Sequence, residues 1–265
     1  MPAEDLVRLV AQLGAPYGME KSVKIVPGAV LADRCLLSIH RAGLGPAPLD
    51  RLIRIGRELE IPAEFADELP RAFDDAEFVH FGHEAGPGFE LRKIYFEYAG
   101  AARRAIATAN GGSVLVHLAY KWPVRGPGGG SVTRYSWVHC RTRHAVEARL
   151  RVLLPAAEAP RALRCALGLL DRVAALAEAG RLLMMLVEEP GNPRQSCDLN
   201  VYDAGLCLAQ VCDVIDAALD DFAVPPSQGT PVFGGAGSVA LGHLSAGIGR
   251  DGAEFVTFYY GVEAH

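Results

Sequence analysis

The feature that most constrains this chain is the alternation of strand pairs with helices along its whole length. Pairs of short apolar or β-branched runs, each joined by a connection containing Gly, Pro or Asp, are separated by segments of helical periodicity. Parallel strands need long crossover connections, whereas two runs joined by a short turn form an antiparallel hairpin. The order of segments therefore predicts one antiparallel sheet with helices inserted between its hairpins.

Five hairpins are predicted, and two of them share a local pattern. Phe81-Gly82-His83 and Leu241-Gly242-His243 occupy the same place in the second and fifth pairs, and the return runs KIYFEY and VTFYYG match in aromatic pattern. This similarity indicates an internal repeat. The predicted strand pairs are Ser22–Val26 with Cys35–His40, the stretch Phe78–Tyr98 around its AGPG turn, Ser113–Trp122 with Ser131–Arg141, Leu183–Glu188 with Ser196–Tyr202, and Ser238–Ser245 with Glu254–Val262.

Helical segments with apolar stripes lie between the hairpins. The most helical part has Leu163, Leu167, Leu170 and Ala174 on one stripe, and Asp203 is a candidate cap for the last helix. The Pro- and Gly-rich stretch Val224–Gly237 is expected to be a link. The predicted helices are Leu49–Leu59, Ala63–Phe73, Ala101–Ala109, Ala145–Leu153, Ala159–Ala179 and a segment from Asp203 to Phe222 with Leu208, Val211, Ile215, Ala218 and Phe222 on its stripe.

The return strands alternate between a polar or aromatic set and an aliphatic set. Lys93, Tyr95 and Glu97 oppose Ile94 and Phe96, for example. Because helices with one apolar stripe need an apolar surface to cover, the aliphatic side should face outward and the polar side inward. We therefore predict an α+β fold: a single domain, residues 1–265, in which an antiparallel ten-stranded β-barrel is wrapped by helices around a lumen wide enough for a ligand.

Composition narrows the classes of partner. The formal net charge is −5 and no basic block stands out, which argues against nucleic acid. The most apolar region, Ala162–Val187, is interrupted by charged residues, so no membrane span is expected. Six cysteines without a CxxC pair, and a start unlike a signal peptide, favour free thiols and a cytoplasmic location.

Lys93-Ile94-Tyr95 on a return strand, together with Lys121, Tyr202 and the late TFYYG, resembles the ABBA aromatic prenyltransferases. The resemblance implies a barrel of helix–strand–strand–helix repeats. It also implies transfer of an allylic prenyl group from a diphosphate donor to an electron-rich aromatic acceptor, either a small indole or phenol or an aromatic residue of a peptide. No cofactor is required by the sequence, although Mg²⁺ could accompany the donor diphosphate.

Under this resemblance, candidate site residues fall into three groups. Cations for the leaving diphosphate would be Lys93 and Lys121, with Arg134 and Arg194 as additions; the alternation leaves open which way the strand with Arg134 faces. Tyr95, Tyr202 and Tyr259 would shield the allylic cation from water. The base that accepts the acceptor's proton would be Glu84, Glu97 or Asp198.

Two alternatives remain open: a barrel that binds or carries an apolar small molecule without catalysis, and a cyclase or isomerase using Glu84 and His80. No metal site is expected, because His80 and His83 point to opposite faces of a strand. The acidic residues of the last helix are interpreted as a solvated surface rather than a magnesium site: Asp213, Asp216, Asp220 and Asp221.

Overall fold

A closed antiparallel sheet forms the centre of the computed structural model, which describes residues 3–108, 112–126, 129–140, 142–176, 182–233 and 237–265. The strand order is β11-β10-β9-β8-β7-β6-β5-β4-β3-β1, and pairing of β11 with β1 closes the ring. The short β2 (Ala29–Leu31) pairs with β1 beside this ring. The ten wall strands are β1 (Gly18–Val26), β3 (Asp33–His40), β4 (Phe78–Gly86), β5 (Phe89–Glu97), β6 (Val114–Arg125), β7 (Ser131–Trp137), β8 (Leu183–Glu188), β9 (Gln195–Asn200), β10 (Leu241–Ile248) and β11 (Glu254–Ala264). The predicted barrel is confirmed.

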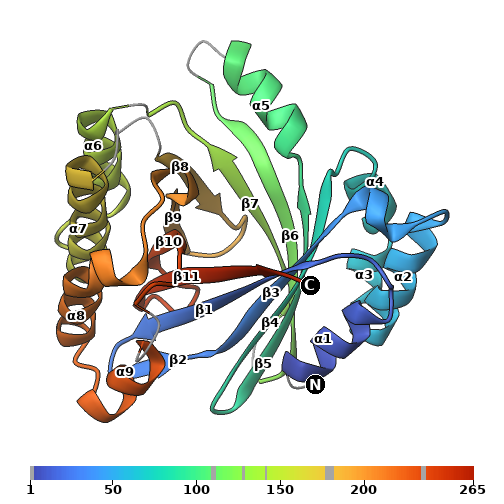
Figure 1. Ribbon diagram of the computed structural model, residues 1–265, viewed down its shortest axis with the longest axis horizontal. Helices are drawn as coiled ribbons and strands as arrows, with labels where there is room; N and C mark the ends of the chain where they lie inside the picture. Colours follow the sequence, from blue (N-terminus) through green and yellow to red (C-terminus); the bar gives the residue numbers. More distant parts are fainter. Residues whose placement is uncertain (1–2, 109–111, 127–128, 141, 177–181, 234–236) are drawn as a thin grey trace.

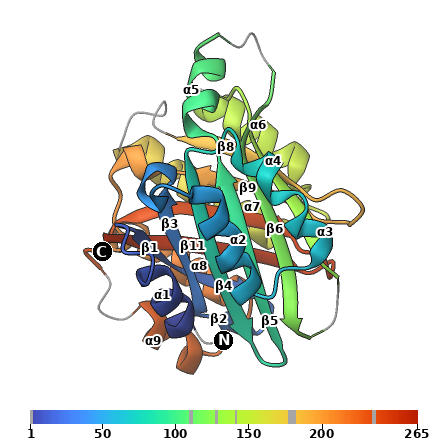
Figure 2. The ribbon, with the colours of Figure 1, turned by 90° about the vertical axis from the view of Figure 1, so that its right-hand side faces the viewer.

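Helices cover the barrel from outside in two groups. In Figure 1, α6, α7 and α8 lie beside the strands β8 to β11, and Figure 2 shows α1 and α2 in front of the strands β3 to β6. Among the described residues, no helix is long and apolar enough to cross a bilayer. The α-helices are α1 (Ala3–Ala11), α2 (Pro48–Glu58), α3 (Ala63–Ala66), α4 (Leu69–Phe73), α5 (Ala99–Thr108), α6 (Arg143–Leu153), α7 (Pro160–Leu176), α8 (Cys212–Asp221) and α9 (Pro226–Phe233); 3₁₀ turns are η1 (Arg41–Leu44), η3 (Tyr202–Ala204) and η4 (Leu208–Val211).

The aliphatic face of the sheet points outward, as the alternation predicts. Ile94 and Phe96 on β5 are fully buried in a cluster with residues of α2 and α4. Phe73 of α4 meets Phe96 edge-on, with ring centroids 6.4 Å apart. A second cluster buries residues of α7 and α8 against β9, β10 and β11. The two larger hydrophobic cores therefore lie between barrel and helices. The interior of the barrel holds the polar side chains together with a smaller cluster that includes Tyr135 and Met185.

Several helix predictions need correction. The segment 63–73 is two short helices, because Pro70 stands in the first turn of α4, where its fixed φ starts a new helix. In α7 the buried stripe includes Ala166 and Val173, while Leu167 is half-buried and Ala174 exposed.

The last helix and the ends of some elements also differ from the prediction. Asp203, the expected cap, lies inside the 3₁₀ turn η3; a second turn, η4, follows, and α8 begins only at Cys212. The expected link 224–237 contains α9. The expected ends at Ala109, Arg141 and Ala179 lie outside the described residues.

The close pairing of β9 with β10 depends on a glycine. Gly247 faces Ser196, and an added Cβ would lie 2.2 Å from the carbonyl oxygen of Gln195 and 2.5 Å from the Cα of Ser196. Because both are backbone atoms, the strands must separate to admit a methyl group. We expect Gly247→Ala to lower the free energy of unfolding by about 1–3 kcal/mol, measured by urea denaturation. Gly112→Ala is the control, because its new methyl group has no atom of the described residues within 4 Å; an equal loss of unfolding free energy in both variants would contradict this explanation.

Candidate functional site

A cavity of about 430 Å³ lies inside the barrel. Each of the ten wall strands contributes to its lining, so closure of the sheet creates the cavity. Its size suits a small organic ligand. The lining includes charged and aromatic side chains: Arg34, Lys93, Tyr95, Tyr259, His80, Glu97, His117, Asp198 and His243.

A buried carboxylate organises the first part of the polar interior. Glu84 on β4 accepts a hydrogen bond from the ammonium group of Lys93 and forms an ion pair with Arg34. Lys24 Nζ lies 3.8 Å from Glu84 Oε1. The sheet register explains the grouping, since Arg34 is the direct cross-strand partner of Glu84, and Lys93 stands opposite Gly82. Burial alone would raise the pKa of Glu84, but the charges of Arg34 and Lys93 hold this pKa well below its usual value.

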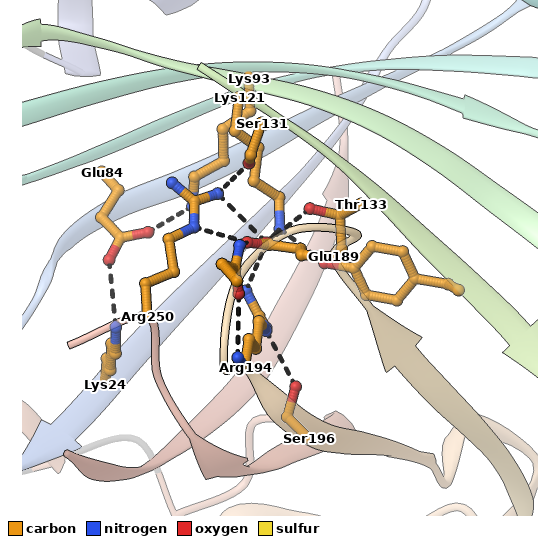
Figure 3. Close-up of polar contacts among 12 residues, drawn as sticks. Lys24, Glu84, Lys93, Lys121, Ser131, Thr133, Glu189, Arg194, Ser196 and Arg250 are labelled. Carbon is orange, nitrogen blue, oxygen red and sulfur yellow. Dashed lines mark hydrogen bonds and ion pairs between the residues drawn. The ribbon is translucent and has the colours of Figure 1, made fainter. Parts of the chain in front are cut away.

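A second buried carboxylate, Glu189, lies just after β8. Its side chain is fully buried and accepts hydrogen bonds from Thr133 (2.6 Å), Arg194 (3.0 Å) and Arg250 (2.6 Å), while Lys121 Nζ is 3.5 Å away. Figure 3 shows these side chains, drawn from different strands and turns, converging on Glu189, with Lys93 nearby. Burial would raise the pKa of Glu189, but the hydrogen bond from Arg250 and the charge of Lys121 lower it strongly.

The two carboxylates leave an excess of basic groups. We call six residues the cationic cluster: Lys24, Arg34, Lys93, Lys121, Arg194 and Arg250. Lys93 and Lys121 are direct neighbours across β5 and β6, an arrangement in which like charges repel. Burial lowers the pKa of Lys93 to about 8 and that of Lys121 well below its usual value. Six basic groups around two carboxylates form an environment that a multivalent anion would stabilise.

The structure places the residues predicted as diphosphate-binding cations in two different environments. Lys93, Lys121 and Arg194 belong to the cluster, whereas Arg134 points away from the barrel interior and is exposed. Its neighbour Tyr135 faces inward instead, which settles the orientation of β7. Arg134 is therefore removed from the candidate site.

Tyrosine rings lie against the cationic cluster. Lys121 Nζ is 5.8 Å from the ring centroid of Tyr95 and 5.4 Å from that of Tyr135, and these two rings are 6.0 Å apart. Tyr259 lines the same cavity from β11. The sequence predicts Tyr202 on a strand, but it lies after β9, in the 3₁₀ turn η3. It is 43% exposed, and its hydroxyl donates a hydrogen bond to Glu20. Burial raises the pKa of Tyr95 and Tyr135, so both phenols stay neutral.

A histidine between carboxylates forms another part of the lining. His243 Nδ1 is 2.7 Å from Asp198 Oδ2, its Nε2 is 3.3 Å from Glu20, and its ring stacks on Tyr259 with centroids 3.8 Å apart. Burial would lower the pKa of His243, but the charges of Asp198 and Glu20 raise it well above its usual value. Ser245 donates to the same Asp198 oxygen at 2.6 Å, while Oδ1 of Asp198 is buried without a hydrogen-bond partner among the described residues.

The three carboxylates predicted as bases have different surroundings. Glu84 is held by Arg34 and Lys93, and Glu97 lies 3.0 Å from Nε2 of His80. Among the described contacts, His80 pairs with Ser38 and Glu97 rather than with Glu84, so the suggested Glu84–His80 acid–base pair is not assembled. Asp198 alone of the three has a buried oxygen without a hydrogen bond among the described residues.

The acidic residues set aside in the last helix are on the surface. Asp213 pairs with Arg172 and Asp221 with Arg164, on exposed faces of α7 and α8. These contacts agree with a solvated helix face.

Lys93 should make stability depend on pH in a known direction. Its pKa is about 8 in the folded protein, against 10.5 for a solvated lysine, so between these values the unfolded chain binds more protons. The free energy of unfolding of the wild type should therefore rise relative to that of Lys93→Met by up to about 1.4 kcal/mol per pH unit in this range. Chemical denaturation at pH 7, 8, 9 and 10 measures the difference. A difference that stays constant with pH would contradict the buried position of the ammonium group.

Comparison with known proteins supports the fold. No protein-family model matches the sequence, and no curated protein matches it. Among solved structures, the prenyltransferase PriB in its apo form is 16% identical, with 92% of this chain and 79% of that chain covered and a TM-score of 0.59. AnaPT from Neosartorya fischeri is 13% identical (91% and 77% covered, TM-score 0.53), and NotF in complex with brevianamide F and DMSPP is also 13% identical (91% and 79%, TM-score 0.55). The predicted resemblance to the ABBA aromatic prenyltransferases is confirmed at the level of the fold.

Proposed function

We propose that this protein transfers an allylic prenyl group from a diphosphate donor to an electron-rich aromatic acceptor. The observation that carries the proposal is the cationic cluster, which adjoins tyrosine rings inside a closed, cavity-containing barrel. The fold shared with solved prenyltransferases supports it, as does the complex of one of them, NotF, with brevianamide F and DMSPP.

The cationic cluster would bind the donor diphosphate and stabilise it as a leaving group. When the bond between the allylic carbon and the phosphate oxygen breaks, the electron pair remains on the diphosphate and its negative charge grows. Fixed cations such as Lys93, Lys121 and Arg34 stabilise this developing charge without reorganising. Arg194 and Arg250 would close the same site from the β8–β9 and β10–β11 connections.

The tyrosine rings would protect the allylic cation. Tyr95, Tyr135 and Tyr259 present aromatic faces that attract a cation, and the phenols of Tyr95 and Tyr135 are poor nucleophiles because they stay protonated. The aromatic acceptor would then attack the cation. A new carbon–carbon, carbon–oxygen or carbon–nitrogen bond forms, and the proton at the attacking atom must leave.

Asp198 is the best placed of the predicted bases. Its Oδ1 lacks a hydrogen-bond partner among the described residues and can accept one from an N–H or O–H of the acceptor, while His243 and Ser245 hold Oδ2 in place. Glu84 stays ionised as the partner of the donor-binding cations, and so remains part of the anion site rather than a base.

A carrier of an apolar molecule is the competing function. Binding a neutral apolar ligand does not require basic groups, and burying them is unfavourable without a matching anion. The excess of cations over carboxylates therefore favours the prenyltransferase over the carrier.

The direct test is an assay of the purified chain. Dimethylallyl and geranyl diphosphate are each incubated with a panel of indoles, phenols and Trp- or Tyr-containing peptides, with and without Mg²⁺, and products are identified by mass. We expect an acceptor mass increased by one prenyl group. Tight binding of an apolar ligand with no transfer to any acceptor would favour the carrier instead.

Lys121 should be needed for turnover but not for folding. Lys121→Met removes a cation aimed at the leaving group and should lower kcat by about 10² or more, measured by product formation at saturating donor. Arg134→Met, which removes an exposed guanidinium from the outer face, is the matched control and should leave kcat unchanged. Equal rates for wild type and Lys121→Met would remove this lysine from the site.

Tyr95 should limit capture of the cation by water. Tyr95→Leu removes an aromatic face beside Lys121, so the ratio of prenyl alcohol to prenylated acceptor should rise several-fold. Product analysis by chromatography measures this ratio. Tyr17→Leu alters a ring that stacks on His265 and is not among the described residues lining the cavity, so it should leave the ratio unchanged. An unaltered ratio in Tyr95→Leu would exclude this tyrosine from shielding.

A further inference from the structure

Three potential metal ligands from adjacent strands converge in the cavity lining. His80 on β4, Glu97 on β5 and His117 on β6 each offer one donor atom, and these atoms all lie within 4.8 Å of one another. Glu97 is the direct cross-strand partner of His117, and His80 Nε2 lies 3.0 Å from Glu97 Oε2. The sheet register therefore brings these donors together. We call them the His80–Glu97–His117 triad.

The positions of the rings are compatible with a shared ion. The ring centroids of His80 and His117 are 5.9 Å apart, with an angle of 63° between the ring planes. A tetrahedral ion with bonds of about 2.1 Å holds its donors about 3.4 Å apart. Small side-chain rotations can close the remaining distance.

We propose that the His80–Glu97–His117 triad binds a divalent first-row transition metal such as Zn²⁺, Co²⁺ or Fe²⁺. Two imidazoles and one carboxylate are a ligand set that such metals favour. Three protein ligands leave at least one position open, and the triad faces the cavity, so that position is available to a ligand atom inside the barrel.

A hydrogen bond between Ser38 and His80 resembles those that orient metal-binding histidines. Ser38 Oγ lies 2.7 Å from Nδ1 of His80, on the side of the ring opposite Nε2. Metal-bound histidines usually hydrogen-bond through their second nitrogen, which fixes the ring orientation and tautomer. His80 is thus already oriented to present Nε2 to an ion beside Glu97.

This site is distinct from a magnesium ion that travels with a diphosphate. Mg²⁺ prefers oxygen ligands, whereas two of the three donors here are imidazole nitrogens. Glu97 is also four residues along β5 from Lys93, or about 13 Å at the rise of an extended strand. The triad and the cationic cluster therefore occupy different levels of the barrel, and metal binding does not depend on the proposed prenyl transfer.

Cobalt titration tests the proposal without an activity assay. Tag-free chain, stripped with a chelator and dialysed, is titrated with Co²⁺ while visible d–d absorption is recorded. We expect saturation at one Co²⁺ per chain, displacement by Zn²⁺, and no displacement by an equal concentration of Mg²⁺. His117→Ala and Glu97→Gln should each weaken Co²⁺ binding at least about tenfold, and Ser38→Ala about 10- to 100-fold.

The control separates this site from surface histidines. His144→Ala removes an exposed imidazole on α6 and should bind Co²⁺ as the wild type does. Circular dichroism of the metal-free variants checks that each one folds. If His117→Ala or Glu97→Gln unfolds, Ser38→Ala still tests the proposal, because it leaves all three proposed ligands in place. Absence of stoichiometric Co²⁺ binding, or undiminished binding in both Glu97→Gln and Ser38→Ala, would overturn the proposal.

Discussion

The structure depends on how the barrel accommodates buried positive charge. Cations taken out of water are unfavourable unless carboxylates or an anion balance them. Glu84 and Glu189 provide part of this balance, each contacting three basic side chains of the cationic cluster. In the proposed function, the remaining excess of cations would bind a multivalent anion beside the tyrosine rings of Tyr95 and Tyr135. Under that proposal, burying Lys93 and Lys121 would lower the stability of the fold while supplying the positive charge that the anion needs.

Closure of the sheet makes this arrangement feasible. An open sheet would have edges and a wet face, and its lysines would remain solvated. In the closed ring each strand sends alternate side chains inward, and the register places Lys93 beside Lys121 and Arg34 beside Glu84. The helices bury the aliphatic face outside, so hydrophobic packing and the polar interior are built from opposite sides of the same strands.

Much of the fold could be predicted from the sequence, because period-2 alternation and single-striped helices each determine which face is covered. Lys93, Tyr95 and Asp198 could be placed inside by the same rule. Arg34 follows the same alternation on β3, but the sequence pattern of the first hairpin is too weak to show that Arg34 belongs to the strand and faces inward. Glu189, Arg194 and Arg250 lie in the connections between strands, where the sequence has no periodicity from which the direction of a side chain could be predicted.

Contacts between strands that are distant in sequence could not be predicted in this way. The approach of His80 to His117 requires the pairing of β4, β5 and β6 in one register, which the spacing of His80 and His83 on one strand does not indicate. The same limit applies to Asp198 and His243, which are joined by the pairing of β9 with β10. Tyr202 resembles a strand residue because the polar alternation continues one residue pair beyond the last strand position.

The central claim is that the cationic cluster is a diphosphate site. Calorimetric titration with non-hydrolysable dimethylallyl thiolodiphosphate at pH 8, in buffers of different ionisation enthalpy, measures both affinity and proton exchange. Because burial lowers the pKa of Lys93 to about 8 and an arriving anion raises it again, the account predicts binding with net proton uptake, reduced in Lys93→Met. Absence of binding, or binding without proton uptake and equal in the variant, would contradict it.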